Sequence, residues 1–262
     1  MSILEVENIG IAFGGLRALD RVGFEVAEGE IFAVIGPNGA GKTTLFNIVS
    51  GLYRPGEGRV RLLGQDVTGI EPHLLAEKGL SRTFQNLQLF GRMTALENVM
   101  VGRHLRESRG ILRHLFLRRA VEHEERESRA RARDLLAFVG LDRLADQPAN
   151  ALPYGAAKRL EIARALASEP RILLLDEPAA GCNPAETGEI EALIREIARR
   201  GVTVVLVEHD MRLVMRLSHR IHVLNHGRTL AEGAPAEIRL NPAVIEAYLG
   251  HHGAKEAARA VA

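Results

Sequence analysis

A glycine-rich segment near the start of the chain carries the side chains best suited to hold phosphate groups. Its glycines let the backbone fold so that several N–H groups point inward, and a lysine and two threonines follow them. A lysine at this spacing can reach the β- and γ-phosphates of a nucleotide, and the first threonine hydroxyl can hold Mg²⁺. We therefore predict a nucleoside triphosphate site, whose residues are Gly36, Pro37, Asn38, Gly39, Ala40, Gly41, Lys42, Thr43 and Thr44.

The sequence on either side of this segment supports that interpretation. The apolar run Ile31–Ile35 predicts a buried strand before it, and Thr44–Ser50 predicts a helix after it. The start of a helix adds partial positive charge beside a phosphate. A glycine turn without a ligand is the alternative, and the flanking strand and helix disfavour it.

Two acidic residues, Asp176 and Glu177, follow the apolar run Ile172–Leu175. A carboxylate at the end of a strand beside a phosphate loop can bind Mg²⁺ directly or through water, and we predict this role for Asp176. Glu177 could polarise the water that attacks the terminal phosphate. A strand that merely runs into an acidic turn is the alternative, but the lysine of the phosphate loop earlier in the chain favours the functional interpretation.

Two further polar residues come at the ends of predicted strands. His209 follows the run Val202–Val207, and Gln85 follows Gly79–Phe84. Because α/β proteins bind ligands at the carboxyl ends of parallel strands, we predict that His209 contacts the γ-phosphate. The Gln85 amide could coordinate Mg²⁺ or orient the attacking water. A histidine with a purely structural role is the alternative for His209.

Composition places the chain among ordinary globular proteins. It has 262 residues, 46% hydrophobic residues and a net charge near +1, so nucleic acid is not expected as the main partner. One cysteine, Cys182, fits a reducing compartment. We find neither a signal peptide nor a membrane-spanning run, and expect a cytosolic protein that meets the membrane only through partners. The basic stretch Arg103–Arg119 is interpreted as part of an exposed, charged helix pair rather than a nucleic-acid site.

The remaining pattern predicts an α/β fold. Near-continuous apolar runs are typical of parallel strands covered on both faces, whereas residues 94–150 read as helical, with Gly140 able to end a helix. A tight turn is expected at His226-Gly227. Further strands are predicted at Leu4–Ile9, Val22–Val26, Gly58–Leu63, Arg171–Leu175, Ile221–Leu224 and Thr229–Ala231, and further helices at Ala156–Ala167 and 186–199.

Taken in order, the phosphate loop, Gln85, residues 152–156, Asp176-Glu177 and His209 resemble the motifs of the ATP-binding cassette (ABC) ATPases. This resemblance implies a P-loop NTPase (RecA-like) core, an N-terminal antiparallel β-subdomain and an inserted α-helical subdomain. It implies a single domain over 1–250, with its core at about 1–90 and 165–250, its helical subdomain at about 91–164, and a tail at 251–262. Phe13 stands where such proteins stack an aromatic ring on adenine; a core residue at a strand end is the alternative.

Three segments narrow the resemblance to the ATPase subunits of branched-chain amino acid importers. They are Leu152–Gly155 with Lys158–Arg164, then Asp176–Pro184, then Asn241–Gly250. The family implies ATP and Mg²⁺ as ligands, a second ATPase subunit (identical or paralogous), two membrane permeases, and a periplasmic protein that delivers the substrate. It places the subunit on the cytoplasmic face of the inner membrane.

The segment at 152–156 departs from the usual ABC signature Leu-Ser-Gly-Gly-Gln. Pro153 replaces the serine, Tyr154 the first glycine and Ala156 the glutamine, while Gly155 is kept. The Gly155 and Ala156 amides can still meet the γ-phosphate held by the opposite subunit. Asn183 similarly stands where many ABC proteins have aspartate.

The resemblance implies a mechanism in which one subunit's phosphate loop binds ATP and another's signature helix caps it. Glu177 would activate water, while His209 and Lys42 balance charge on the transferred phosphoryl group. Two alternatives stay open. One is an ABC ATPase for another cargo, such as urea, amides or lipopolysaccharide, and the other is a soluble ABC protein of DNA repair or translation.

Overall fold

The computed structural model describes residues 1–104 and 118–248 and contains two β-sheets. The larger sheet has six strands in the order β10-β9-β3-β8-β7-β6, and all its neighbouring strands are parallel except β9 and β10. Its strands are β3 (Ile31–Ile35), β6 (Leu80–Arg82), β7 (Ile172–Asp176), β8 (Thr203–Val207), β9 (Arg220–Asn225) and β10 (Arg228–Gly233).

The second sheet is antiparallel and is formed mainly by the N-terminal part of the chain. It has four strands in the order β2-β1-β4-β5. These are β1 (Ser2–Phe13), β2 (Leu16–Ala27), β4 (Glu57–Leu62) and β5 (Gln65–Asp66).

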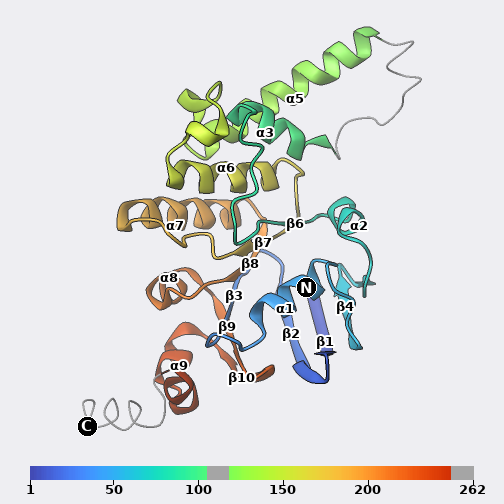
Figure 1. Ribbon diagram of the computed structural model, residues 1–262, viewed down its shortest axis with the longest axis vertical. Helices are drawn as coiled ribbons and strands as arrows, with labels where there is room; N and C mark the ends of the chain where they lie inside the picture. The colour runs from blue at the N-terminus through green and yellow to red at the C-terminus, as the bar shows by residue number, and fades with distance from the viewer. Residues whose placement is uncertain (105–117, 249–262) are drawn as a thin grey trace.

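Helices surround the larger sheet and form a separate group at one end (Figure 1). In Figure 1, α7, α8 and α9 lie on one side of the sheet, and α3, α5 and α6 gather beyond α7. The helices are α1 (Lys42–Val49), α2 (Pro72–Glu77), α3 (Ala95–Gly102), α5 (Arg118–Phe138), α6 (Tyr154–Leu166), α7 (Pro184–Arg199), α8 (Met211–Leu217) and α9 (Pro235–Leu240).

The central strands are buried on both faces, as their apolar sequences predict. Every residue of β3, β7 and β8 is buried. Because side chains alternate along a strand, Ile31, Ala33 and Ile35 pack toward the helices, whereas Phe32 and Val34 pack toward the antiparallel sheet. The larger sheet therefore separates two hydrophobic cores.

The predicted fold class is confirmed, with differences in the length and number of elements. The strands predicted at Leu4–Ile9 and Val22–Val26 are parts of a long hairpin, in which β1 and β2 each have 12 residues. The short helices α2, α8 and α9 were not predicted. As expected, the chain turns at Gly140 (φ +71°) just after α5 and at His226-Gly227 between β9 and β10. Most of the basic stretch Arg103–Arg119 and the whole tail 251–262 lie outside the described residues.

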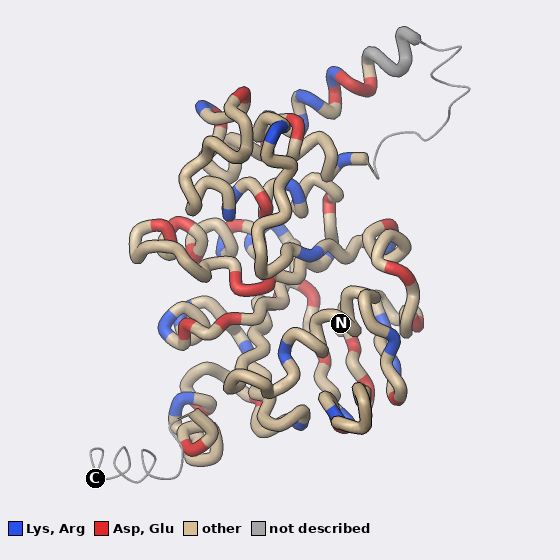
Figure 2. The backbone as a smooth tube through the Cα atoms, viewed as in Figure 1, with Lys and Arg blue, Asp and Glu red and all other residues tan. Residues whose placement is uncertain are grey.

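Charged side chains of both signs are interspersed along the described chain, as Figure 2 shows. Many of them join neighbouring elements. Arg216 of α8 pairs with Glu191 of α7 at 2.8 Å, and Arg228 of β10 pairs with Asp20 of β2 at 2.7 Å. Such partly exposed pairs each contribute little to stability.

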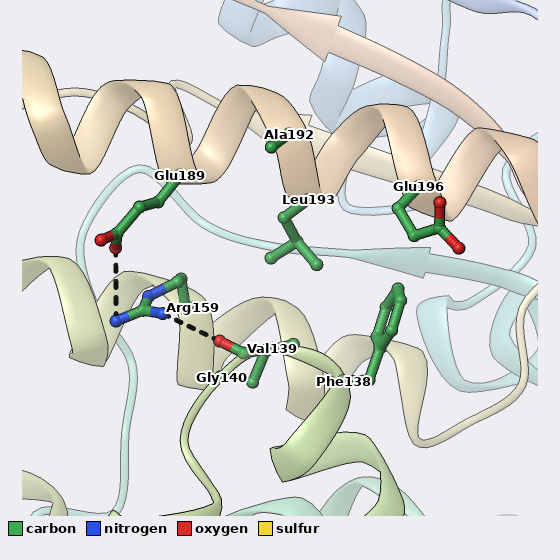
Figure 3. Close-up of a pocket in the computed structure, with 8 residues that line it drawn as sticks. All are labelled: Phe138, Val139, Gly140, Arg159, Glu189, Ala192, Leu193 and Glu196. Carbon is green, nitrogen blue, oxygen red and sulfur yellow. Dashed lines mark hydrogen bonds and ion pairs between the residues drawn. The ribbon is translucent and has the colours of Figure 1, made fainter.

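The helical group meets the rest of the molecule along α7 (Figure 3). The Arg159 guanidinium donates to the Val139 carbonyl at 3.0 Å and lies 3.4 Å from the Glu189 carboxylate of α7. The Arg200 guanidinium stacks on the Phe138 ring, 3.9 Å from its centroid. A hollow of about 350 Å³ lies between these contacts. The contacts made by Arg159 and Arg200 thus join the end of α5 to α7.

Candidate nucleotide-binding site

The glycine-rich segment forms the loop between β3 and α1, as predicted. A Cβ at Gly36 would lie 2.2 Å from the Leu224 carbonyl oxygen, and one at Gly41 would lie 2.7 Å from Leu19. Gly41 also has a left-handed backbone (φ +105°) at the start of α1. Only glycine fits these two positions, and the start of α1 is left open toward the loop.

Lys42 lies over this loop. Its ammonium group donates to the carbonyls of Gly36 and Pro37 at 2.7 and 3.1 Å. Burial lowers the pKa of Lys42, while the negative charges of Glu177 and Asp176 act in the opposite direction. The lysine and the two acids therefore lie near enough for their opposite charges to interact.

Asp176 is the last residue of β7 and is 4% exposed. Its Oδ2 accepts a hydrogen bond from the Arg82 guanidinium at 2.8 Å, and Arg82 also donates to Asn47 and Ser50 at the end of α1. Reasoning from the sequence missed Arg82. The only signal for it is a lone arginine at the end of a strand, immediately before the Gln85 loop.

Gln85, Glu177 and His209 come together beyond the carboxyl ends of β6, β7 and β8. The Gln85 amide donates to Glu177 Oε2 at 3.1 Å, and His209 Nδ1 lies 3.7 Å from the same oxygen. Glu177 has a left-handed backbone (φ +49°), which is uncommon for a residue other than glycine and clusters at functional sites. The three side chains form a polar group that can hold and orient a water molecule.

The buried carboxyl group of Glu208 forms hydrogen bonds with the loops that carry Glu177 and His209. Glu208 is 1% exposed and accepts hydrogen bonds from the backbone amides of Ala179 at 3.0 Å and His209 at 3.1 Å. Burial raises the pKa of Glu208, although these hydrogen bonds oppose the rise. Glu208 thus joins the loop after Glu177 to the loop that carries His209.

Tyr154, Gly155 and Ala156 are the first residues of α6. Pro153 precedes the helix, and the Tyr154 hydroxyl donates to the Ala180 carbonyl at 3.1 Å. Gly155 and Ala156 are buried in this chain, and a Cβ at Gly155 would come within 2.6 Å of Glu186. The segment therefore contacts the loop that follows Glu177 in its own chain.

Phe13 lies at the end of β1 with 47% of its surface exposed. Its ring meets Tyr53 edge to face, with centroids 5.5 Å apart. An exposed pair of aromatic rings of this kind offers a surface on which a base can stack, whereas a core residue would be covered.

The C-terminal part of the chain also reaches the phosphate loop. Residues 242–248 form a helix, and Tyr248 of this helix lies beside the Gly36 backbone. Burial raises the pKa of Tyr248 to about 12. A hollow of about 450 Å³ lies between the loop, the β9–β10 turn and this helix. The sequence supplied no reason to assign Tyr248 to the site.

Over 1–104 and 118–248, no helix is both long enough and apolar enough to cross a bilayer. Within those same ranges, His, Cys, Asp and Glu side chains do not form a group of three or more that could hold a metal ion alone.

A glycine loop between a buried strand and a helix, facing acids at the end of a neighbouring parallel strand, defines a P-loop ATPase. Residues 19–180 match the family model described as ABC transporter, and residues 228–254 match that of branched-chain amino acid ATP-binding cassette transporters. The chain belongs to the ATP-binding cassette family of ABC transporters and is an ATPase of that family. Its class binds ATP and works as dimers with transmembrane permease components.

Named relatives cover almost the whole chain. It is 48% identical over 249 residues to the high-affinity branched-chain amino acid transport ATP-binding protein BraF of Pseudomonas aeruginosa, covering 95% of this chain and 98% of BraF. It is 44% identical over 249 residues to LivG of Escherichia coli, with the same coverage.

Solved structures of ABC cassettes have the same fold. A nucleotide-free ATP-binding cassette from an ABC transporter superposes with a TM-score of 0.83 at 35% identity, covering 96% of this chain and all of that one. A dimeric bacterial ABC transporter cassette superposes with a TM-score of 0.75 at 29% identity, covering 88% of this chain and 98% of that one.

Proposed function

We propose that this chain is the ATP-hydrolysing subunit of an importer for branched-chain amino acids. In this proposal it sits on the cytoplasmic face of the membrane with a second ATPase subunit, identical or paralogous, beneath two permeases. A periplasmic binding protein delivers the substrate and does not touch this chain. The names of BraF and LivG and the match over residues 228–254 support this cargo.

One observation carries the catalytic part of the proposal. Glu177 accepts a hydrogen bond from Gln85 at 3.1 Å, lies 3.7 Å from His209, and acts electrostatically on Lys42 of the phosphate loop. A carboxylate in this setting can orient a water and take up its proton. We infer that Glu177 is the general base, Gln85 helps to orient the water, and Lys42 and His209 balance charge on the phosphoryl group.

The nucleotide would be held by several separate parts of the dimer. Backbone amides of residues 36–44 and the Lys42 ammonium bind the phosphates, and the Phe13 ring stacks on adenine. Pro153, Tyr154, Gly155 and Ala156 would cap the nucleotide of the opposite subunit through the amides at the start of α6. In keeping with these roles, the nucleotide-binding core would span about 1–90 and 165–250, and the helical subdomain about 91–164.

The residues at the site fit Mg²⁺ by the chemistry of their oxygens. Mg²⁺ prefers oxygen ligands and keeps several waters, so one or two protein oxygens beside substrate phosphates suffice. Thr43 and Gln85 would supply such oxygens. Asp176 already accepts a hydrogen bond from Arg82 on Oδ2, so its other oxygen would hold the ion through water. When bound, Mg²⁺ neutralises charge developing on the phosphates.

Reconstitution of the complete transporter tests the cargo. The tagged chain is purified with the membrane proteins and binding protein that accompany it, and the complex is placed in lipid vesicles. Leucine, isoleucine or valine should stimulate ATP hydrolysis and enter the vesicles, whereas urea and short amides should do neither. Stimulation of ATP hydrolysis by urea or amides alone would show that the transporter carries those compounds instead of branched-chain amino acids. Co-purification with DNA or ribosomes would contradict a transport role.

A further inference from the structure

Charged side chains of α6 form hydrogen bonds with the loops that carry Gln85 and Glu177. Lys158 is 2% exposed, and its ammonium group donates to the backbone carbonyls of Gln85 at 3.3 Å and Glu177 at 3.4 Å. An ammonium group is costly to bury unless it is hydrogen-bonded to groups of this kind. Lys158 therefore links the backbones of Gln85 and Glu177 to α6 by hydrogen bonds.

Two more charged residues of α6 bind the Gln85 loop on the same side. Glu161, also 2% exposed, accepts a hydrogen bond from the Phe84 amide at 3.4 Å, and the Arg164 guanidinium donates to the Gln88 carbonyl. Burial raises the pKa of Glu161, while the Phe84 hydrogen bond and the charge of Lys158 oppose that rise. Lys158, Glu161 and Arg164 are spaced three residues apart, so they share one face of the helix.

The same helix contacts the loop after Glu177 through its first residue. The Tyr154 hydroxyl donates to the Ala180 carbonyl at 3.1 Å, and the Lys158 ammonium lies 5.9 Å from the centroid of the Tyr154 ring. Glu177 itself has a left-handed backbone, a conformation that persists only where its surroundings hold it. A hydrogen bond from Lys158 to the Glu177 carbonyl is one such restraint.

We propose that Lys158 is a positioning residue for ATP hydrolysis, which holds the Gln85 and Glu177 backbones in register with the start of α6. The inference rests on the proposed function, because it assumes that Glu177 activates water and that the start of α6 caps the opposite subunit's nucleotide. A displacement of the start of α6 then moves Lys158, and with it the base of the chain's own ATP site. Lys158 thus links the two ATP sites of a dimer.

Substitution of Lys158 by methionine, which keeps the length of the side chain and removes its charge and donors, tests the inference in the intact transporter. The turnover number for ATP should fall about 10–100-fold, since misplacement of a reacting group by about 1 Å costs on that order. The KM for ATP should stay within about twofold, because Lys158 touches none of the phosphate-loop residues that bind nucleotide. Lys78→Met is the matched control, since within the described residues the Lys78 ammonium bonds to the exposed Gln65 side chain.

A double-mutant cycle separates positioning from a general loss of structure. If Lys158 acts through Glu177, Lys158→Met should cause little further loss in a Glu177→Gln background. Lys158→Gln, which keeps a neutral donor, should retain more turnover than Lys158→Met and serves as the second variant if the methionine protein does not fold.

Several outcomes would overturn the inference. Unchanged turnover in Lys158→Met, additive losses in the double mutant, or equal losses of turnover and nucleotide binding in both Lys158 variants would each do so. Wild-type protein that hydrolyses ATP alongside an unaffected Lys158→Met contradicts this inference alone. Wild-type protein without ATPase activity contradicts the proposed function, and the inference with it.

Discussion

At the scale of single residues, Lys42 is the side chain on which we expect the proposed nucleotide binding to depend most. Its ammonium group bonds to the Gly36 and Pro37 carbonyls, and the negative charges of Asp176 and Glu177 act on it as well. A triphosphate would offer it stronger, charged acceptors in place of these neutral carbonyls. Lys42 is therefore already in the place where phosphate oxygens would meet it.

Substitution of Lys42 by alanine should weaken ATP binding. A hydrogen bond between charged groups contributes about 1.5–3 kcal/mol, which corresponds to a loss in affinity of about 10–150-fold. Titration calorimetry on the full chain measures the dissociation constant, with Lys78→Ala as the control for loss of a surface lysine. An unchanged constant would count against the whole assignment of the phosphate site.

At the scale of elements, the β9–β10 hairpin supports the phosphate loop and is held by a partly buried ion pair. His222 of β9 is fully buried, and its Nδ1 lies 2.8 Å from Glu232 of β10, which also accepts from Arg220 at 2.7 Å. Gly227, in the turn of the hairpin, donates to the Ala40 carbonyl at 3.0 Å. The pairing of these two strands therefore helps to fix the back of the loop.

Glu232→Gln should lower the free energy of unfolding in a pH-dependent way. Burial alone would raise the pKa of Glu232, but hydrogen bonds from His222 and Arg220 lower it overall. A carboxyl whose pKa is lower in the folded state stabilises above its unfolded pKa and loses that contribution as the pH falls through the folded value. We expect a deficit of about 1 kcal/mol near neutral pH.

Urea denaturation at a series of pH values provides the measurement. The difference between wild type and variant should be constant above about pH 5 and should shrink below the ordinary glutamate pKa of about 4.3. A difference that grows on acidification would show that the ion pair does not stabilise the hairpin.

The elements also show which features the sequence could and could not reveal. The runs that form β3, β7 and β8 were recognisable because strands buried on both faces are almost wholly apolar. The helices α2, α8 and α9 have six or seven residues each, too few turns for a helical period to stand out. The hairpin of β1 and β2 continues through polar residues, so its ends were missed.

The same contrast holds for the candidate site. Lys42, Asp176, Glu177, Gln85 and His209 were predicted because each follows a strand that the sequence defines. Arg82, Lys158 and Tyr248 were not, because their roles depend on which backbone groups the fold brings within reach. A charged residue on a helix predicts an exposed position on average, and only the packing of α6 shows that Lys158 is buried.

At the scale of the whole molecule, the six-stranded sheet lies between the antiparallel sheet and the helical group and connects them. One hydrophobic core joins it to the antiparallel sheet and α1, and the other joins it to α6, α7 and the remaining helices. Asp176 and Glu177 lie at the carboxyl end of β7, a strand of the sheet that both cores share. A movement of the helical group relative to the core would therefore act on Glu177 through α6.

Turnover of Glu177→Gln is the most direct test of the proposal that Glu177 is the general base for ATP hydrolysis. The variant keeps the size of the side chain and one acceptor oxygen, and it removes the negative charge and the capacity to take a proton. ATP affinity should stay close to that of the wild type, and turnover should fall by about 10²–10⁴-fold, the usual contribution of a positioned base. Equal turnover in the two proteins at equal ATP occupancy would contradict the account.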